Sequence, residues 1–288
     1  MNKKYDLIGF GEILLRLSPT KNDKGMALQK QVLGSELDVV SGAAALGLKT
    51  GFISCLPRHG VSDYILDYLR SHGIDDNLVI LNRYEDAKLG LYFAEEERFP
   101  GKNDVVYDRK KAALNQIALN DIPAAVFDNT RLFHTGGVTL SLNENILQTG
   151  LELMRCFKQK GVLISFDVNY EENLWNEAEL KSSLVKILPY VDILFISERI
   201  LRRTLPKKTA LKELIKDYSL NFEINTVVAI EQPKLKLKRS RLKQDPDIVI
   251  YEAQTDTFRL EPPDEGVQLS AEMDRENYIS VVLSNLLK

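Results

Sequence analysis

Glycine is scarce in the second half of this chain. Of its 16 glycines, only Gly266 lies after Gly161. Glycine takes positive φ freely and lets backbone N–H groups close on an anion, so a half without it has few means of cradling a phosphate. The glycines of the first half suit a working α/β fold. The sequence therefore favours a back half that folds without holding a nucleotide.

Cysteine, strong net charge and long apolar runs are also missing. Cys55 and Cys156 are too few for a disulfide framework, which favours a reducing compartment. The formal net charge of −3 gives no reason to expect nucleic acid or an anionic membrane as a partner. No apolar run approaches ~18 residues, and the first residues lack a signal-peptide pattern. We therefore expect a cytoplasmic protein without a transmembrane helix.

Short apolar segments alternate with longer amphipathic ones, a pattern that predicts a mostly parallel sheet covered by helices. The predicted strands are Tyr5–Gly9, Gly51–Leu56, Arg131–Thr135, Val162–Asp167, Ile193–Ser197 and Thr226–Ile230. The predicted helices are Tyr64–His72, Asn145–Lys160, Ala178–Leu188 and Thr209–Tyr218. Asp63 is a predicted N-cap, while Gly73 and Gly161 are predicted to end helices.

Two stretches alternate apolar and polar side chains and interrupt this rhythm. They are Ile13–Ser18 with Gln29–Leu33, and Leu89–Ala94 with Val105–Arg109. Their period of two predicts a small antiparallel sheet standing apart from the main one. At 288 residues and 44% hydrophobic content, the chain suits one α/β domain over residues 1–288 that carries this second sheet.

A series of motifs runs along most of the chain in a fixed order. It comprises Gly9-Phe10-Gly11-Glu12, Leu89-Gly90-Leu91-Tyr92-Phe93, Val105-Val106-Tyr107-Asp108-Arg109, Phe133-His134-Thr135-Gly136-Gly137 and Ser165-Phe166-Asp167-Val168-Asn169-Tyr170. The series resembles the ribokinase-like (PfkB) carbohydrate kinases, in particular their 2-keto-3-deoxygluconate kinase branch. The resemblance implies a three-layer α/β/α domain with a β lid over the sugar, formed by about residues 13–33 and 88–110. Such lids often form a dimer interface, so a homodimer through the lid is a further expectation.

The resemblance implies a sugar-acid site beneath the lid. Tyr92, Tyr107 and Arg109 match the lid positions that contact the sugar acid, and a planar guanidinium suits a carboxylate. The alternative is that both tyrosines pack the lid sheet and that Arg109 is a solvated charge. Asn169 belongs to the same expected site.

Three positions depart from the family pattern around this sugar. The early motif Gly-Gly-Ala-x-x-Asn is present as Leu33-Gly34-Ser35-Glu36-Leu37-Asp38. Leu33 replaces the first glycine, Gly34 remains, and Asp38 replaces the amide. Where the branch usually has an arginine near substrate and phosphate, this chain has Glu171. Both acids add negative charge beside an anionic ligand. Glu171 is equally well explained as an ordinary acidic loop residue.

The catalytic motif of the family is altered most. Relatives carry Asp-x-x-Gly-Ala(or Gly)-Gly-Asp at the start of a helix, where glycine amides hold the transferred phosphoryl group and the last Asp is the base. Here the segment is Asp274-Arg275-Glu276-Asn277-Tyr278-Ile279-Ser280, with Ser280 at the base position. A serine is a poor general base near neutral pH. Relatives continue through further helical structure beyond the position of Lys288, so this sequence is short at its C-terminus relative to the family pattern.

Other motifs give no confident site. Glu198 aligns with the magnesium-organising Asn-x-x-Glu pattern, but a lone carboxylate is a weak metal site, so no metal site is predicted. His134 is expected to pack rather than catalyse. Residues 234–243 are rich in Lys and Arg, yet they lack the aromatic residues that stack on bases. A solvated hairpin is therefore preferred there over a nucleic-acid contact.

Two hypotheses follow from these motifs. In the first, the chain is a catalytically eroded sugar-kinase homologue that keeps a sugar-acid pocket without competent phosphate transfer. In the second, it is an active kinase that uses ATP and Mg²⁺, with Asp274 or Glu276 as the base. The nucleotide-binding residues are not identified in either case.

Overall fold

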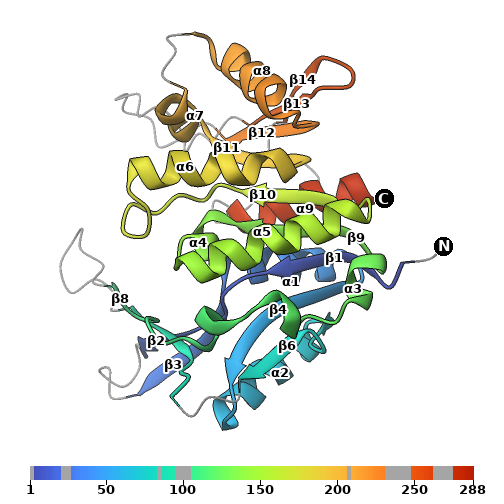
Figure 1. Cartoon of the computed structure of the whole chain (residues 1–288). Coiled ribbons are helices and arrows are strands. Elements are labelled where there is room, and N and C mark those ends of the chain that lie inside the picture. Colours follow the sequence, from blue (N-terminus) through green and yellow to red (C-terminus); the bar gives the residue numbers. More distant parts are fainter. Residues whose placement is uncertain are drawn as a thin grey trace.

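The computed structural model describes residues 3–20, 27–82, 86–94, 105–205, 209–230, 248–261 and 275–288. Its main sheet has the strand order β14-β13-β12-β11-β10-β9-β1-β4-β5, with β6 beside β4 (Figure 1). The strands are β1 (Tyr5–Phe10), β4 (Thr50–Pro57), β5 (Ile74–Asp75), β6 (Val79–Asn82), β9 (Thr130–Gly136), β10 (Leu163–Asp167), β11 (Ile193–Ser197), β12 (Thr226–Ile230), β13 (Ile248–Glu252) and β14 (Thr257–Glu261). Pairing is parallel from β12 to β5 and antiparallel where β13 and β14 join.

All six predicted main-sheet strands are confirmed, two of them to the residue. β1, β4, β9 and β10 are almost entirely buried, which explains why they have continuous apolar runs rather than alternation. The hairpin formed by β13 and β14 was not predicted.

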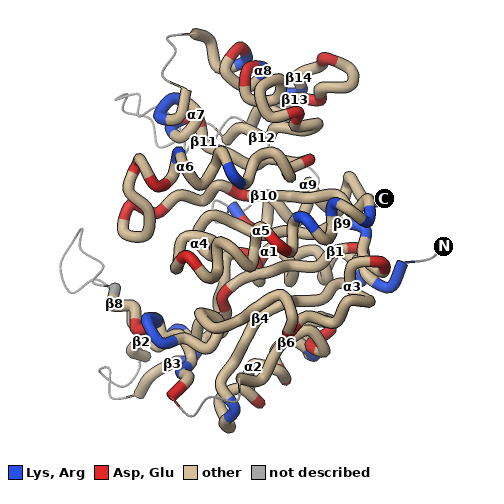
Figure 2. Tube along the Cα trace, viewed as in Figure 1, with Lys and Arg blue, Asp and Glu red and all other residues tan. Residues whose placement is uncertain are grey.

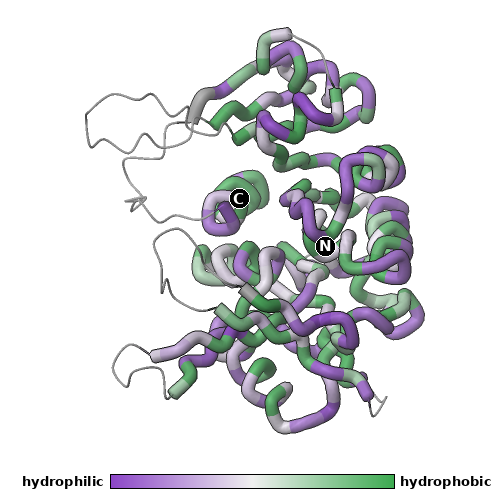
Figure 3. The backbone as a smooth tube through the Cα atoms, turned by 90° about the vertical axis from the view of Figure 1, so that its left-hand side faces the viewer, coloured by the Kyte–Doolittle hydropathy of each residue, from purple (hydrophilic) through white to green (hydrophobic). Residues whose placement is uncertain are grey.

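Helices cover both faces of this sheet, which confirms the three-layer arrangement. Buried residues of α5 (Glu144–Gln159), α6 (Glu177–Ile187), α7 (Glu198–Thr204) and α8 (Leu211–Phe222) share one core with the sheet. The other core contains α1 (Ser35–Ala45), α2 (Gly60–Ser71) and α9 (Arg275–Leu287). In Figure 3, α9 ends at the C label on the opposite side of the sheet from the helices at the right.

The predicted helix ends are correct where left-handed glycines occur. Gly73 and Gly161 have φ of 73° and 69°, and they follow α2 and α5. The predicted N-cap Asp63 is wrong, because α2 begins at Gly60 with His59 as its N-cap. Asp63 instead lies in the first turn, where its negative charge suits the helix dipole.

A second sheet stands apart from the main one, as Figure 1 shows. Its strand order is β3-β2-β7-β8, formed by β2 (Leu14–Pro19), β3 (Leu28–Leu33), β7 (Gly90–Ala94) and β8 (Val105–Asp108). We call these four strands the lid. The expectation of an antiparallel lid is corrected, because β2 and β7 pair in parallel between two antiparallel pairs. The hairpins β2–β3 and β7–β8 each account for the alternation of apolar and polar residues in the sequence. That alternation carries no signal for how the two hairpins pair with each other.

No helix in the described ranges is long and apolar enough to cross a membrane. Two features of the sequence lie outside the described residues: Asp274 and the basic segment 234–243.

Candidate functional site

A cavity of about 200 Å³ lies between the lid and the main sheet. The residues that line it are Glu12, Leu14, Leu33, Gly34, Ser35, Glu36, Asp38, Tyr92, Tyr107, Arg109, Val138, Thr139 and Glu171. Glu12 follows β1 and Glu171 lies beyond β10, so the cavity adjoins the carboxyl edge of parallel strands, where α/β folds bind ligands. Five of the six predicted sugar-site residues, all but Asn169, therefore line one cavity.

The lid presents aromatic rings to this cavity. Tyr92 and Tyr107 are cross-strand partners, which places both on the same face of the lid with ring centroids 5.0 Å apart. Arg109 lies over the Tyr107 ring at 4.4 Å from its centroid. The lid wall is therefore aromatic and carries one guanidinium.

Arg109 is held by two carboxylates. Its Nη1 lies 3.1 Å from Oε2 of Glu12, and its Nη2 lies 4.0 Å from Oε2 of Glu171. The Arg109 side chain is only 11% exposed. The guanidinium of Arg109 therefore already contacts two acidic side chains before any ligand enters.

Glu12 and Glu36 are buried acids joined through Thr139. The Thr139 hydroxyl donates to Oε2 of Glu36 at 2.8 Å and accepts from the backbone N–H of Glu12 at 3.2 Å. Burial raises the pKa of both carboxyl groups to about 7, partly offset for Glu12 by Arg109. Among the described residues, Oε1 of each glutamate has no hydrogen-bond partner. Each acid therefore has an acceptor atom to spare.

Glycines make this close packing feasible. A Cβ on Gly34 would lie 2.4 Å from the Glu12 carbonyl oxygen, and one on Gly136 would lie 2.6 Å from Oε1 of Glu36. A Cβ on Gly137 would lie 2.0 Å from the Val168 carbonyl oxygen. These glycines of the first half therefore allow backbone segments and the buried acids to pack closely around the cavity.

Asn169 sits beside the cavity. Its side-chain amide donates to the Ser35 hydroxyl at 3.3 Å, and Ser35 lines the cavity. Its φ of 23° is positive, which is uncommon for a residue with a side chain. Asn169 therefore supports the first turn of α1 from the end of β10.

Asp167, at the end of β10, forms an ion pair with Arg275, the first residue of α9. Nε of Arg275 lies 2.8 Å from Oδ2 and 3.1 Å from Oδ1 of Asp167, and Nη2 also donates to Oδ1. The carboxylate is 6% exposed and the guanidinium side chain 24%. This two-pronged contact fixes the start of α9 to the main sheet.

Ser280 lies on the buried face of α9 rather than on the cavity wall. Its hydroxyl donates to the Asn277 carbonyl of the same helix at 2.6 Å. A Cβ on Gly42 would lie 2.4 Å from its Oγ, so Ser280 packs against the middle of α1. Gly42 is seven positions along α1 from Ser35, which corresponds to roughly 10 Å of helix. Glu276 lies in the first turn of α9 and is half-buried.

Glu198 and His134 have structural partners. Glu198 accepts from Nε of Arg202 at 2.8 Å, one turn further along α7. His134 is 1% exposed and shares a hydrogen bond of 3.0 Å with the Ser165 hydroxyl. Burial lowers the pKa of His134 to about 4, so the ring is neutral at neutral pH. Within the described ranges, no group of three or more His, Cys, Asp or Glu residues is placed to hold a metal ion.

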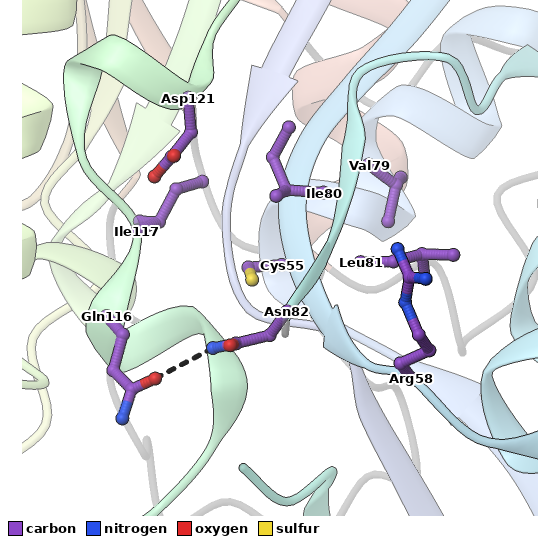
Figure 4. Close-up of a pocket in the computed structure, with 9 residues that line it drawn as sticks. All are labelled: Cys55, Arg58, Val79, Ile80, Leu81, Asn82, Gln116, Ile117 and Asp121. Atoms are coloured by element: carbon purple, nitrogen blue, oxygen red, sulfur yellow. Dashed lines mark hydrogen bonds between the residues drawn. The ribbon is translucent and has the colours of Figure 1, made fainter. Parts of the chain in front are cut away.

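A second cavity, of about 800 Å³, opens beside β4 and β6 (Figure 4). Cys55 and Ile80 line its interior, and Arg58 and Asp121 lie at opposite sides of it in Figure 4. Asn82 donates to Gln116 at 2.8 Å across one side. No sequence pattern predicted this cavity, because its residues come from separate segments without a shared motif.

Sequence reasoning missed Glu12, Glu36 and Thr139 as cavity residues, and Arg275 as the partner of Asp167. An acid directly after a buried strand, as Glu12 is, was the available signal. Glu36 occupies the first turn of the helix after Gly34, again where parallel strands end. Neither position reveals its burial from sequence.

Comparisons with known proteins agree with this architecture. The model of the pfkB family carbohydrate kinases matches residues 2–234. A 2-dehydro-3-deoxygalactonokinase of Haloferax volcanii is 28% identical over 226 residues, which cover 77% of this chain and 70% of that protein. Matches to 5-dehydro-2-deoxygluconokinases, such as that of Clostridium perfringens, span about half of the relative, 53% in that case.

Solved structures share the fold. A PfkB protein from Polaromonas sp. JS666 superposes with a TM-score of 0.80 at 22% identity, covering 98% of this chain and 89% of the other. A 2-dehydro-3-deoxygluconokinase from Thermotoga maritima gives 0.75 at 22% identity, covering 89% and 79%. The ribokinase-like fold is therefore confirmed, including its separate small sheet. This chain belongs to the pfkB family of carbohydrate kinases.

Proposed function

We propose that this chain binds a sugar between its lid and its main sheet and that it transfers phosphate poorly or not at all. The observation that carries the second part is the Arg275–Asp167 ion pair at the start of α9. In the family pattern, that turn offers glycine amides to the phosphoryl group. Here the glycine positions carry Asn277, Tyr278 and Ile279. Arg275, just before them, is already engaged by Asp167, so a bound phosphate would have to compete for it.

The position of Ser280 supports the same proposal. Its hydroxyl donates to its own helix and its side chain packs against Gly42. Loss of a positioned base typically removes about 10²–10⁴ in rate, and each lost oxyanion-type donor removes about 3–4 kcal/mol of transition-state stabilisation.

The cavity supports the sugar-binding part. Phenol hydroxyls, carboxylates and a guanidinium converge from the lid, α1 and the end of β10 in a space of about 200 Å³. These groups hydrogen-bond hydroxyls from several directions, as sugar sites require. The sequence resemblance favours a sugar acid, whereas the excess of acidic residues around the cavity disfavours an anionic ligand.

A coupled assay of ADP release tests the proposal. With Mg-ATP and 2-keto-3-deoxygluconate, glucosamine or neutral hexoses, we expect turnover far below the ordinary kinase range of about 1–100 s⁻¹. Turnover within that range would instead support the active kinase, with Glu276 or Asp274 as base and Mg²⁺ and ATP as cofactors. Glu276→Gln would then abolish it if Glu276 is the base.

We also propose that the lid forms a homodimer. Phe93 and Val106 are cross-strand partners on the lid face opposite Tyr92 and Tyr107, and both are exposed, Val106 to 60%. Leu28, exposed to 55%, lies on the same face of β3. Exposed apolar groups on one sheet face commonly mark an interface. Light scattering should give twice the chain mass, and Val106→Lys should halve it.

A further inference from the structure

The cavity beneath the lid carries more negative than positive charge. Four of the residues that line it are acids, namely Glu12, Glu36, Asp38 and Glu171, and among the described lining residues Arg109 is the only base. In Figure 2, acidic positions in red lie between the lid and the main sheet.

The single guanidinium is not available to an incoming carboxylate. Arg109 contacts Glu12 at 3.1 Å and Glu171 at 4.0 Å, and it stacks over Tyr107. A sugar acid would have to displace Glu12 from Arg109, which would leave a buried carboxylate unpaired. Arg16 lies further out on the lid, with its guanidinium 5.7 Å from the Tyr92 ring centroid, and it is not among the lining residues.

The buried acids also call for hydrogen-bond donors. Oε1 of Glu12 and Oε1 of Glu36 are buried beside Gly90 and Gly136, with no donor among the described residues. A ligand donor would satisfy them once these side chains turn toward the cavity that they line. An unsatisfied buried acceptor costs about 1–3 kcal/mol. A ligand carboxylate offers only acceptors, whereas an ammonium offers three donors and a positive charge.

We propose that the ligand of this cavity is a sugar bearing a protonated amine, not a sugar acid. This inference rests on the proposed sugar-binding function and specifies the class of its ligand. Asp38 and Glu171 replace an amide and an arginine of the family pattern, and both changes make the cavity more negative. The lid tyrosines remain to bind the hydroxyls that all sugars share.

The test compares three six-carbon probes that differ in charge: glucosamine, glucose and gluconate. Binding to the full chain is measured by calorimetry and by thermal shift at neutral pH and low salt. We expect glucosamine to bind at least tenfold more tightly than gluconate, with glucose between them, and the preference for glucosamine to shrink as salt is added. Gluconate binding as tightly as glucosamine would overturn the inference.

Glu171 and Glu172 provide a matched pair of variants. Glu171 lines the cavity, whereas Glu172 is exposed and pairs with Arg203 at 2.9 Å on the outside. Glu171→Arg should raise gluconate affinity at least tenfold and weaken glucosamine binding. Glu172→Arg changes the net charge equally and should leave both affinities unchanged. Equal effects of the two exchanges would show that the cavity charges do not select the ligand.

Failure of the underlying function has a different signature. If none of the three probes, nor 2-keto-3-deoxygluconate, shifts the melting temperature of the wild type or of Glu171→Arg, the sugar-binding proposal falls and this inference with it. Tighter binding of the sugar acids than of glucosamine would overturn the amino-sugar inference but leave the sugar-binding proposal standing.

Discussion

Arg275 and Asp167 join the start of α9 to the end of β10, with Nε of the guanidinium 2.8 Å from one carboxylate oxygen. The contact spans 108 residues of sequence and fixes the first turn of α9 to the main sheet. A charged pair with one member 6% exposed depends on its partner, because either charge alone would be left poorly solvated.

Asp167→Asn is therefore expected to destabilise the chain. Breaking a fully buried pair costs about 3–5 kcal/mol, and the partial exposure of Arg275 reduces the expected loss to about 2 kcal/mol. Urea unfolding of the purified chain measures it. Glu177→Gln, which breaks the exposed pair with Lys181 on α6, is the control and should leave the midpoint unchanged. Equal effects of the two exchanges would contradict a structural role for the Arg275 pair.

Gly42→Ala should loosen the packing of α1 on α9. The added Cβ would lie 2.4 Å from Oγ of Ser280, so one helix must shift, at a cost of about 1–3 kcal/mol. Ser280→Ala in the same chain removes the nearest atom and should recover part of the loss. Gly60→Ala, with no atom within 4 Å of its Cβ, is the control and should be neutral or slightly stabilising. A Gly42→Ala variant as stable as the wild type would contradict close packing of α9 on α1 at Gly42.

Glu36→Gln should change how stability depends on pH. The folded pKa of Glu36 is about 7, against an ordinary 4.5, because the group is buried. The folded state therefore binds a proton that the unfolded state releases, and the contribution of Glu36 to stability is full below pH 4.5 and lost as the pH rises through 7. As the pH rises between these values, the free energy of unfolding of the variant should increase relative to that of the wild type, by up to about 3 kcal/mol. Urea unfolding at pH 5 and pH 8 measures the gain, and a constant difference would contradict it.

Cys55 should resist thiol reagents in the native chain. It is buried, and burial raises its pKa to about 12, so almost no thiolate forms at pH 8. Cys156 is partly exposed. We expect one thiol per chain to react with an aromatic disulfide reagent, and two after denaturation. Cys156→Ser should abolish the native reaction, and a rapid reaction in that variant would show that the cavity of Cys55 opens freely.

The main sheet was predictable because its strands are buried on both faces and carry continuous apolar runs. α1 was not predicted, since Gly42 and three neighbouring alanines give it no strong apolar stripe. The parallel pairing of β2 with β7 escaped prediction for a different reason. Register between distant hairpins depends on tertiary packing, which no local pattern encodes.

The site was predictable where a motif named a position. Tyr92 and Tyr107 lie in the lid strands β7 and β8, Arg109 and Gly34 directly follow lid strands, and Asp38 is in the first turn of α1. All five line one cavity because these elements meet there. The partners of those residues were not predictable. Arg109 was expected to be available to a ligand, but it is held by Glu12, which lies 97 residues earlier.

The helix α1 touches the cavity with its first turn, through Glu36 and Asp38, and meets α9 at Gly42. Arg275 fastens one end of α9, and the Leu287 carbonyl, which accepts from Arg131 of β9, fastens the other. We therefore expect ligand binding beneath the lid and the packing of α9 to be coupled through α1. A substitution on α1 near Gly42 is expected to alter ligand affinity although that position does not contact the ligand.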